Sequence, residues 1–256
     1  MKKLVFIGFL GLSLTGCGGG SDSTYVPIDK DNNGNGGSHN AEIQGVYSGS
    51  TSQGQSVTGI IEKNNKFWFL YTPPYQNVVS GFMSGDLKVT GKVAQTTNGK
   101  DYYFAGATSS NTSIMANAET KKSLNGTIAY SGMNQVTFNT TYDASLSESS
   151  AKLSDIVGTY NGTSAIVQGV EKATVSITSN GEISGRGISG CTFTGKATTI
   201  PGAAYFKLDL LFGYSQCYMA GQAVSGIIYY NKTNRAFYAA AENNSRQNAV
   251  LFLATK

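Results

Sequence analysis

The clearest pattern along the chain is an alternation of apolar and polar residues with a period of two. Between residues 206 and 212, apolar positions alternate with Lys207 and Asp209. This spacing is typical of an antiparallel strand that has one face on a core and the other in water. Similar runs recur along the chain, and no stretch after residue 40 has the period of a helix. The sequence therefore predicts an all-β protein.

Several neighbouring runs read as hairpins, because short polar segments separate two strand-like stretches. The predicted pairs are 59–62 with 67–71, 227–230 with 236–239, and 175–177 with the run that begins at Ile183. In the third pair the connection contains Asn180-Gly181. This dipeptide predicts a type I′ turn, in which both central residues have positive φ.

An internal repeat divides the chain into two halves. The motif Ile-x-Gly-x-Tyr-x-Gly occurs at 43–49 and at 156–162, and a second similarity relates 124–130 to 224–230. A serine-rich stretch, 144–154, reads as the joint. We expect two domains of shared topology, at 42–148 and 152–256, each a small antiparallel β-barrel or sandwich of roughly six to eight strands.

The first residues have the layout of a secretory signal. Lys2 and Lys3 precede an apolar segment, 4–14, which is shorter than the roughly 20 residues of a transmembrane helix. Residues 14–17, Leu-Thr-Gly-Cys, resemble a bacterial lipobox. The resemblance implies a signal peptide at 1–16 and a lipid-bearing Cys17, the alternative being an ordinary signal with a chance cysteine. The polar segment 17–41 then reads as a flexible tether.

The lipobox resemblance also implies a location. Gly18 follows the cysteine, where an aspartate would mark retention at the inner membrane in many Gram-negative bacteria. The protein is therefore expected at the outer membrane, held there by the lipid on Cys17. Both locations, the periplasmic face and the cell surface, are compatible with the sequence.

The two other cysteines form an even pair in an exported protein. We predict a disulfide between Cys191 and Cys217, since disulfides persist in oxidising compartments. A reactive thiol or a metal site is the weaker alternative, because Cys191 lies in an alternating stretch and no histidine is nearby in the sequence.

The net charge and the histidine content exclude several classes of function. The formal net charge of +4 falls to +2 when Lys2 and Lys3 leave with the signal, which is not the balance of a nucleic-acid binder. The single histidine, His39, lies in the tether, so His-dependent triads and His-rich metal sites cannot be built. We predict no catalytic residue, no metal and no cofactor.

Two motif matches do not change this picture. Residues 185–190 fit G-x-G-x-x-G, but a dinucleotide-binding site needs a helix afterwards, and strand-like sequence follows here. Residues 149–152 fit the S-x-x-K of serine acyl-enzymes without the companion motifs of those proteins. Carboxylate pairs need no histidine. A hydrolase of envelope glycans therefore stays open as an alternative, with candidates Asp86, Asp101, Asp209 and Glu242.

Two groups of residues are candidates for ligand binding. Residues 67–75 contain the only tryptophan. Consecutive aromatics in a strand point to both faces, so either Phe67, Phe69 and Tyr71 or Trp68 and Leu70 fill the core, and the other set could form an exposed aromatic strip. The candidate ligand-binding residues of this segment are Trp68, Tyr71 and Tyr75. The alternative is a strand covered on both faces, by its barrel and by the neighbouring domain. The three arginines, Arg186, Arg235 and Arg246, could serve an anionic partner or could simply lie on solvated faces.

The mature chain resembles a family of two-domain proteobacterial lipoproteins, with characteristic stretches at 45–59, 189–195 and 226–241. The resemblance implies no activity. In architecture alone, the chain is similar to surface lipoproteins of the transferrin-binding type, whose tethered eight-stranded barrels bind host proteins, but it lacks their long handle domains. We therefore expect a non-enzymatic binding or structural module with a protein or glycan ligand, or alternatively a small-ligand carrier.

Overall fold

The computed structural model describes residues 39–76, 78–132 and 135–256. The predicted signal peptide, Cys17 and nearly all of the tether lie outside the described residues. His39 is described and is exposed to solvent. Within the described part of the chain, no helix has the length and apolar character needed to cross a membrane.

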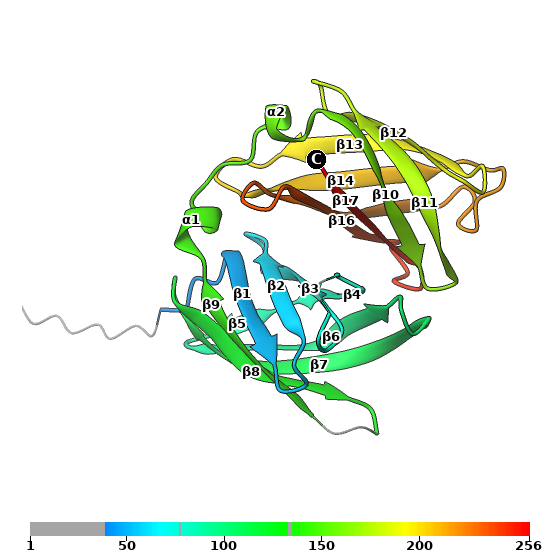
Figure 1. Ribbon diagram of the computed structural model, residues 1–256. Helices are drawn as coiled ribbons and strands as arrows, with labels where there is room; N and C mark the ends of the chain where they lie inside the picture. Colours follow the sequence, from blue (N-terminus) through cyan, green and yellow to red (C-terminus); the bar gives the residue numbers. More distant parts are fainter. Residues whose placement is uncertain (1–38, 77, 133–134) are drawn as a thin grey trace, which may run out of the picture. The chain divides into compact units, whose positions relative to one another are not determined.

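The first half of the chain forms a closed antiparallel barrel (Figure 1). Strands β1 to β4 and β6 to β9 form the ring, which the β4–β6 and β1–β9 pairings close, while β5 extends the sheet as a hairpin with β6. The strands are β1 (Gly45–Thr51), β2 (Ser56–Ile61), β3 (Lys66–Tyr71), β4 (Gly81–Asp86), β5 (Lys88–Thr90), β6 (Val93–Tyr103), β7 (Thr108–Glu119), β8 (Ser123–Tyr130) and β9 (Val136–Tyr142).

The second half forms a closed barrel of eight antiparallel strands, β10 to β17, in chain order. Pairing of β10 with β17 closes it. The strands are β10 (Gly158–Ile166), β11 (Gly169–Ile177), β12 (Glu182–Gly187), β13 (Thr192–Thr199), β14 (Tyr205–Phe212), β15 (Ala223–Asn231), β16 (Ala236–Glu242) and β17 (Ala249–Thr255). The prediction of two tandem antiparallel β units is confirmed, and both are barrels.

Two single-turn helices, α1 (Ala144–Ser147) and α2 (Leu153–Ile156), lie in the predicted joint. The Asp143 carboxylate accepts a hydrogen bond from the backbone N–H of Leu146 at 3.0 Å and so caps α1. One turn is too short to show a helical stripe, which explains why the hydrophobic pattern gives no sign of either helix. Ile156, at the end of α2, belongs to the core of the second barrel.

The repeated motif performs the same structural task in both barrels. The Tyr47 hydroxyl donates to the Ile43 carbonyl at 3.0 Å, and the Tyr160 hydroxyl donates to the Ile156 carbonyl at 2.9 Å. The glycine between each pair has a φ of 144° at Gly45 and 140° at Gly158. Side chains rarely adopt this conformation, so glycine lets the chain bend into the first strand of each barrel.

The last glycine of each motif lies where the barrel closes. A Cβ atom at Gly49 would lie 1.9 Å from the carbonyl oxygen of Asn139 on β9, and one at Gly162 would lie 2.3 Å from that of Leu253 on β17. A side chain at either position would therefore push the closing strands apart.

The second sequence similarity does not mark equivalent strands. Residues 124–130 lie in β8, the seventh strand of the first ring, whereas 224–230 lie in β15, the sixth strand of the second. The shared feature is local. Cβ atoms at Gly126 and Gly226 would lie 2.3 Å and 2.0 Å from backbone carbonyl oxygens of neighbouring strands, so the same close approach selects glycine at two different places.

The three predicted hairpins are present as β2–β3, β11–β12 and β15–β16. The prediction of a type I′ turn at Asn180-Gly181 is wrong. Gly181 has a φ of 79°, but Asn180 is not among the described residues with positive φ. Gly181 N–H donates to the Thr178 carbonyl at 2.9 Å, and Thr178 N–H donates to the Glu182 carbonyl at 2.9 Å. This is a three-residue connection in which only the last residue is left-handed.

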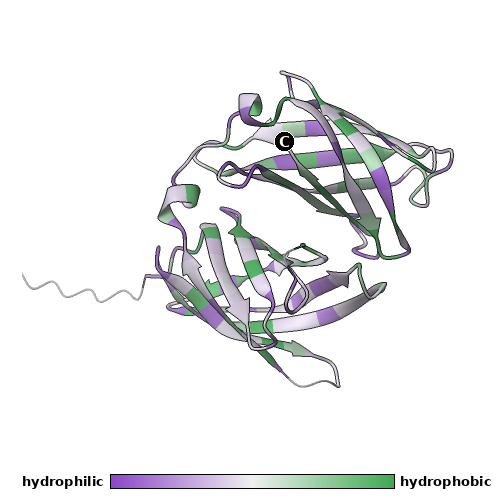
Figure 2. Cartoon of the chain, in the orientation of Figure 1, coloured by the Kyte–Doolittle hydropathy of each residue, from purple (hydrophilic) through white to green (hydrophobic). Residues whose placement is uncertain are grey.

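Apolar side chains form one core inside each barrel and a third core to which both barrels contribute, and apolar and polar bands alternate along the strands (Figure 2). In the third core, strand β3 supplies Trp68 and Leu70, and strands β15 and β17 supply Tyr229 and Leu251. Strand β3 is therefore buried on both faces, because Phe67, Phe69 and Tyr71 point into the first barrel.

Candidate ligand-binding site

Exposed apolar side chains gather at one end of the second barrel. At this end, β10 joins β11, β12 joins β13 and β14 joins β15. Four large side chains here are mostly exposed: Val170 (60%), the second residue of β11, and Ile188 (78%), Tyr214 (87%) and Tyr218 (65%), which lie on the connections. We call these four residues the loop-end patch. Soluble proteins seldom leave apolar groups clustered in water without a functional reason.

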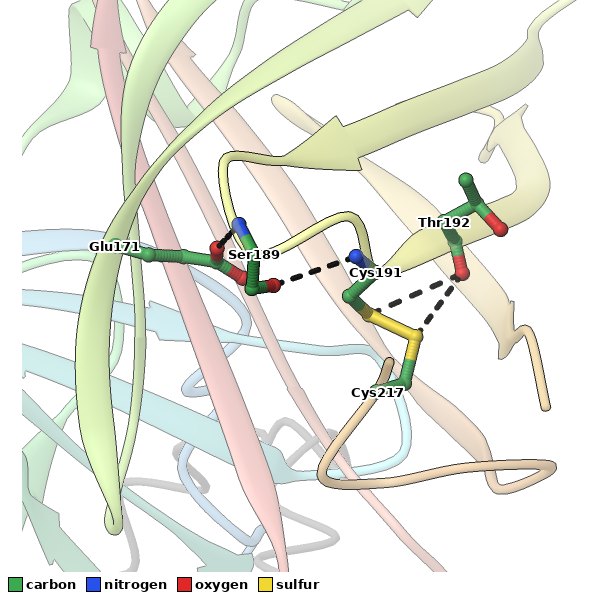
Figure 3. Close-up of a disulfide and its surroundings, with 5 residues drawn as sticks. All are labelled: Glu171, Ser189, Cys191, Thr192 and Cys217. Atoms are coloured by element: carbon green, nitrogen blue, oxygen red, sulfur yellow. Dashed lines mark hydrogen bonds between the residues drawn. A yellow bond between two sulfur atoms is a disulfide. The ribbon is translucent and has the colours of Figure 1, made fainter. Parts of the chain in front are cut away.

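The predicted disulfide lies at the same end and is confirmed (Figure 3). Cys191 directly precedes β13, and Cys217 lies within the ten-residue connection 213–222 between β14 and β15. The bond joins two loops, and the Cα atoms of the two cysteines are 4.5 Å apart. A long surface loop is thereby fixed to the barrel, which lowers the entropy that binding would otherwise cost.

The backbone beside the disulfide is in an unfavourable conformation. Gln216 has a φ of 61°, which a residue with a side chain adopts only when its surroundings impose it. A Cβ atom at Gly190 would overlap the Gln216 side-chain oxygen, so the two loops are in close contact, and the φ of 94° at Gly190 favours glycine there. Such conformations often occur at binding sites, where they aim a side chain.

A pocket of about 270 Å³ opens among these loops. Its floor is apolar and includes Ile166, Phe212 and Met219, with Phe212 and Met219 almost completely buried. Its rim is polar, with the side chains of Gln168, Glu171, Ser189 and Gln216, and Tyr218 also lines it.

Glu171 is the charged residue among those that line this pocket. Its carboxylate accepts a hydrogen bond from the backbone N–H of Ser189 at 2.9 Å, as Figure 3 shows. No hydrogen bond joins the side-chain amides of Gln168 or Gln216 to another group of the described chain. The amides and the second carboxylate oxygen therefore keep hydrogen-bonding capacity that the described chain does not use.

The interior beneath this pocket is nearly filled. An apolar cavity of about 30 Å³ shares Ser164 and Phe212 with the pocket. Pockets for small organic ligands usually measure roughly 300 to 1,000 Å³. A cavity of this size holds about two water molecules at most. The cavity inside the second barrel is therefore too small for an enclosed organic ligand.

The aromatic residues proposed from the sequence do not form an exposed strip. Trp68 is 1% exposed, and its indole N–H donates to Glu62 at 2.8 Å. Tyr71 is buried inside the first barrel, where its hydroxyl donates to Asp101 at 2.6 Å. The alternative of a strand covered on both faces is the correct one. Tyr75 is fully exposed, in the connection between β3 and β4.

The three arginines do not form a common site. Arg186 is exposed on β12 near the loop end, and Arg235 is exposed in the β15–β16 turn at the opposite end of the barrel. Arg246 lies in the β16–β17 loop, where its guanidinium contacts Glu242 at 3.1 Å and donates to the Ser84 carbonyl at 2.8 Å. A joint role of the three in binding an anion is therefore not favoured.

Each of the four candidate carboxylates has its own set of hydrogen-bond or ion-pair partners. Asp86 contacts Asn98, and Asp209 contacts Lys207 and Ser225. Asp101 accepts from Tyr71 and Tyr130, while Glu242 accepts from groups of both barrels. Burial raises the pKa of Asp101 and outweighs the two tyrosine hydroxyls, which lower it. No arrangement of a general acid facing a second carboxylate emerges from these contacts. Nor do the described residues contain a cluster of three metal-ligating side chains.

The sequence analysis missed the loop-end patch. Tyr214 and Tyr218 lie in the stretch 213–221, which has glycine at both ends and no alternating pattern. Aromatic residues in a loop are unusual because they expose apolar surface, and here they flank a cysteine that was predicted to be bonded. That combination was the available signal.

No protein-family model matches the chain, and a search of curated proteins finds no match either. Membership of the two-domain lipoprotein family thus stays a prediction.

Three solved structures show a distant likeness. A candidate outer membrane protein from Bacteroides fragilis is 14% identical, with 83% of this chain and 96% of that chain covered and a TM-score of 0.26. Transferrin binding protein B from Neisseria meningitidis is 14% identical, with 88% and 55% covered and a TM-score of 0.30. The same protein from Haemophilus parasuis is 12% identical, with 84% and 60% covered and a TM-score of 0.27. The fold assignment rests on the strand pairings above and not on these likenesses.

Proposed function

We propose that this protein is a non-enzymatic binding module of the outer membrane, anchored by lipid on Cys17, and that it engages its ligand with the loop-end patch. The single observation that carries this proposal is that four exposed apolar side chains lie at one end of the second barrel, where two of them, Val170 and Tyr218, line a pocket. Tyrosines on loops held by a rigid scaffold are typical of binding surfaces.

Two further features support a binding role. The disulfide and the interlocked loops hold the pocket in place before a ligand arrives, and preorganised sites bind at lower entropic cost. The two buried carboxylates, Asp101 and Glu242, are engaged in hydrogen bonds to tyrosine and serine hydroxyls that serve folding.

The experiment compares capture of envelope and host components by the full-length protein in detergent micelles with capture by an Ile188→Ser/Tyr214→Ser/Tyr218→Ser variant. We expect the wild-type protein to retain components that the variant releases. A matched control, Met115→Ser, removes an exposed apolar side chain (64% exposed) from the first barrel and should leave capture unchanged.

Equal capture by the wild type and the triple variant would overturn the role of the patch. The anchor is tested separately with Cys17→Ser. This variant should keep its β-sheet circular dichroism, leave the membrane fraction and lose incorporation of labelled palmitate. A Cys17→Ser protein that stays in the membrane fraction would contradict the anchor.

A further inference from the structure

We infer that the pocket at the loop end of the second barrel binds an uncharged sugar ring of a glycan. This inference rests on the proposed function, since it names the ligand class of the same site. It is argued from the chemistry of the pocket wall, from its charge and from its size.

The pocket wall is amphipathic in the way a sugar ring is. A sugar ring has a patch of C–H groups on a face and hydroxyl groups around its edge. The pocket opposes apolar and aromatic surface, from Phe212 and Tyr218, to a rim that can donate and accept hydrogen bonds. The amides of Gln168 and Gln216 supply both donors and acceptors, and the free oxygen of Glu171 supplies an acceptor. A purely apolar partner would leave these groups desolvated and unpaired, which is costly.

The charge of the pocket selects against acidic ligands. Glu171 brings a carboxylate to the rim, and neither lysine nor arginine is among the residues that line the pocket. A carboxylate or sulfate on the ligand would face this negative charge without a compensating cation. Uncharged sugars meet no such repulsion, and their hydroxyls can donate to Glu171.

The size of the pocket fits one ring and not a protein surface. About 270 Å³ is close to the lower limit of pockets for small organic molecules. A stable protein interface buries roughly 800 Å² on each partner, which is far more than this pocket offers. A terminal sugar of a glycan would enter alone, while the exposed rings of Tyr214 and Tyr218 could contact the next residues of the chain.

The test uses matched pairs of sugars that differ in charge. Full-length protein in detergent micelles is titrated with methyl glycosides of glucose, galactose and N-acetylglucosamine, and with methyl glucuronide and methyl galacturonide. Binding is read by saturation-transfer NMR, and a microarray of neutral and acidic glycans extends the set. We expect at least one neutral glycoside to bind weakly, with a Kd of roughly 1 mM for a single ring. The matching uronide should bind at least about tenfold more weakly, which corresponds to about 1.4 kcal/mol.

Three variants separate the contributions. Tyr218→Ala should weaken neutral binding roughly tenfold, whereas Tyr75→Ala, which removes an exposed tyrosine of the first barrel, should not change it. Glu171→Gln keeps an oxygen that can accept from Ser189 and removes the charge. This variant should bring uronide binding to within about threefold of the neutral sugar, if one charge sets the difference.

Each outcome is decisive. Uronides that bind wild type as well as neutral sugars do would overturn the charge argument and with it the inference. If no sugar on the array binds, but capture of envelope or host components still depends on the loop-end patch, the ligand is a protein, so the inference fails and the proposed function stands. If neither sugar binding nor capture depends on the patch, both fail.

Discussion

Removing the charge of Glu242 should destabilise the protein strongly, because its buried carboxylate is the counter-charge of two cations. The Glu242 carboxylate is 4% exposed and lies 3.1 Å from the Lys66 ammonium and 3.1 Å from the Arg246 guanidinium. It also accepts from the Ser84 hydroxyl at 2.7 Å and the Tyr102 hydroxyl at 3.0 Å. Glu242→Gln keeps the shape of the side chain and leaves the two cations without their counter-charge.

The expected magnitude follows from the burial of the group. Removing one partner of a buried ion pair costs about 3 to 5 kcal/mol, because the other charge remains uncompensated. The lysine and arginine side chains are 28% and 26% exposed, so water screens part of this cost. We therefore expect the free energy of unfolding to fall by about 3 kcal/mol, the lower end of this range. For a domain pair of this size, that corresponds to a fall in Tm of roughly 6 to 12 °C.

The assay is urea unfolding at pH 7 of wild type and variant, followed by circular dichroism, with the disulfide intact. The control is Asp209→Asn, whose ion pair with Lys207 is largely exposed and whose loss should cost less than about 1 kcal/mol. A Glu242→Gln variant that unfolds within 1 kcal/mol of wild type, by the same assay, would refute the reasoning.

The pH dependence provides a second check on Glu242. Burial disfavours its charged form, but Lys66, the Ser84 hydroxyl and Arg246 outweigh burial and hold the pKa of Glu242 below its ordinary value. A carboxylate with a lowered pKa in the folded state contributes stability above its unfolded pKa and loses it as the pH falls through the folded pKa. The difference between wild type and Glu242→Gln should therefore narrow in acid.

Three more predictions follow from buried groups. Replacing Cys191 and Cys217 together with serine should lower the free energy of unfolding by up to about 3.5 kcal/mol, the chain-entropy value for their separation of 26 residues, in urea titrations with and without reductant. Burial raises the pKa of Asp101, so its ionisation costs stability as the pH rises through the interval between its unfolded and folded pKa. Asp101→Asn should remove that loss, and a pH series of Tm values that stays unchanged would contradict it. Tyr160→Phe should cost about 1 kcal/mol, because the Ile156 carbonyl loses its buried donor, and a change in Tm indistinguishable from zero would contradict this.

The strand content and the duplication were readable from local patterns because they depend on neighbouring residues. Alternation gives strands, and a turn between two runs gives a hairpin, so three hairpins could be predicted from residues at most about twelve positions apart. The repeated Ile-x-Gly-x-Tyr-x-Gly motif could be recognised for the same reason, since the tyrosine hydroxyl bonds four residues back.

What the sequence did not reveal depends on contacts between distant residues. Glu242 meets Ser84 and Tyr102 across separations of 158 and 140 residues, and no local pattern indicates this. Trp68 looked like a surface candidate because an aromatic strand must use both faces. Only the third core shows that both faces of β3 are covered. The conformation of the 179–181 connection likewise depends on how the flanking strands pair, not on the Asn-Gly dipeptide alone.

The two barrels differ at corresponding ends, and this difference favours the second barrel as the ligand-binding unit. In the first barrel, the end at which β3, β6 and β8 finish is occupied from within. Asp101 lies there, and the hydroxyls of Tyr71 and Tyr130 satisfy both of its carboxylate oxygens. The equivalent end of the second barrel has an apolar floor at Phe212 and free polar groups at the rim instead. Filling the first end stabilises that barrel, whereas leaving the second end open exposes four large apolar side chains to water, a cost that a bound ligand would offset.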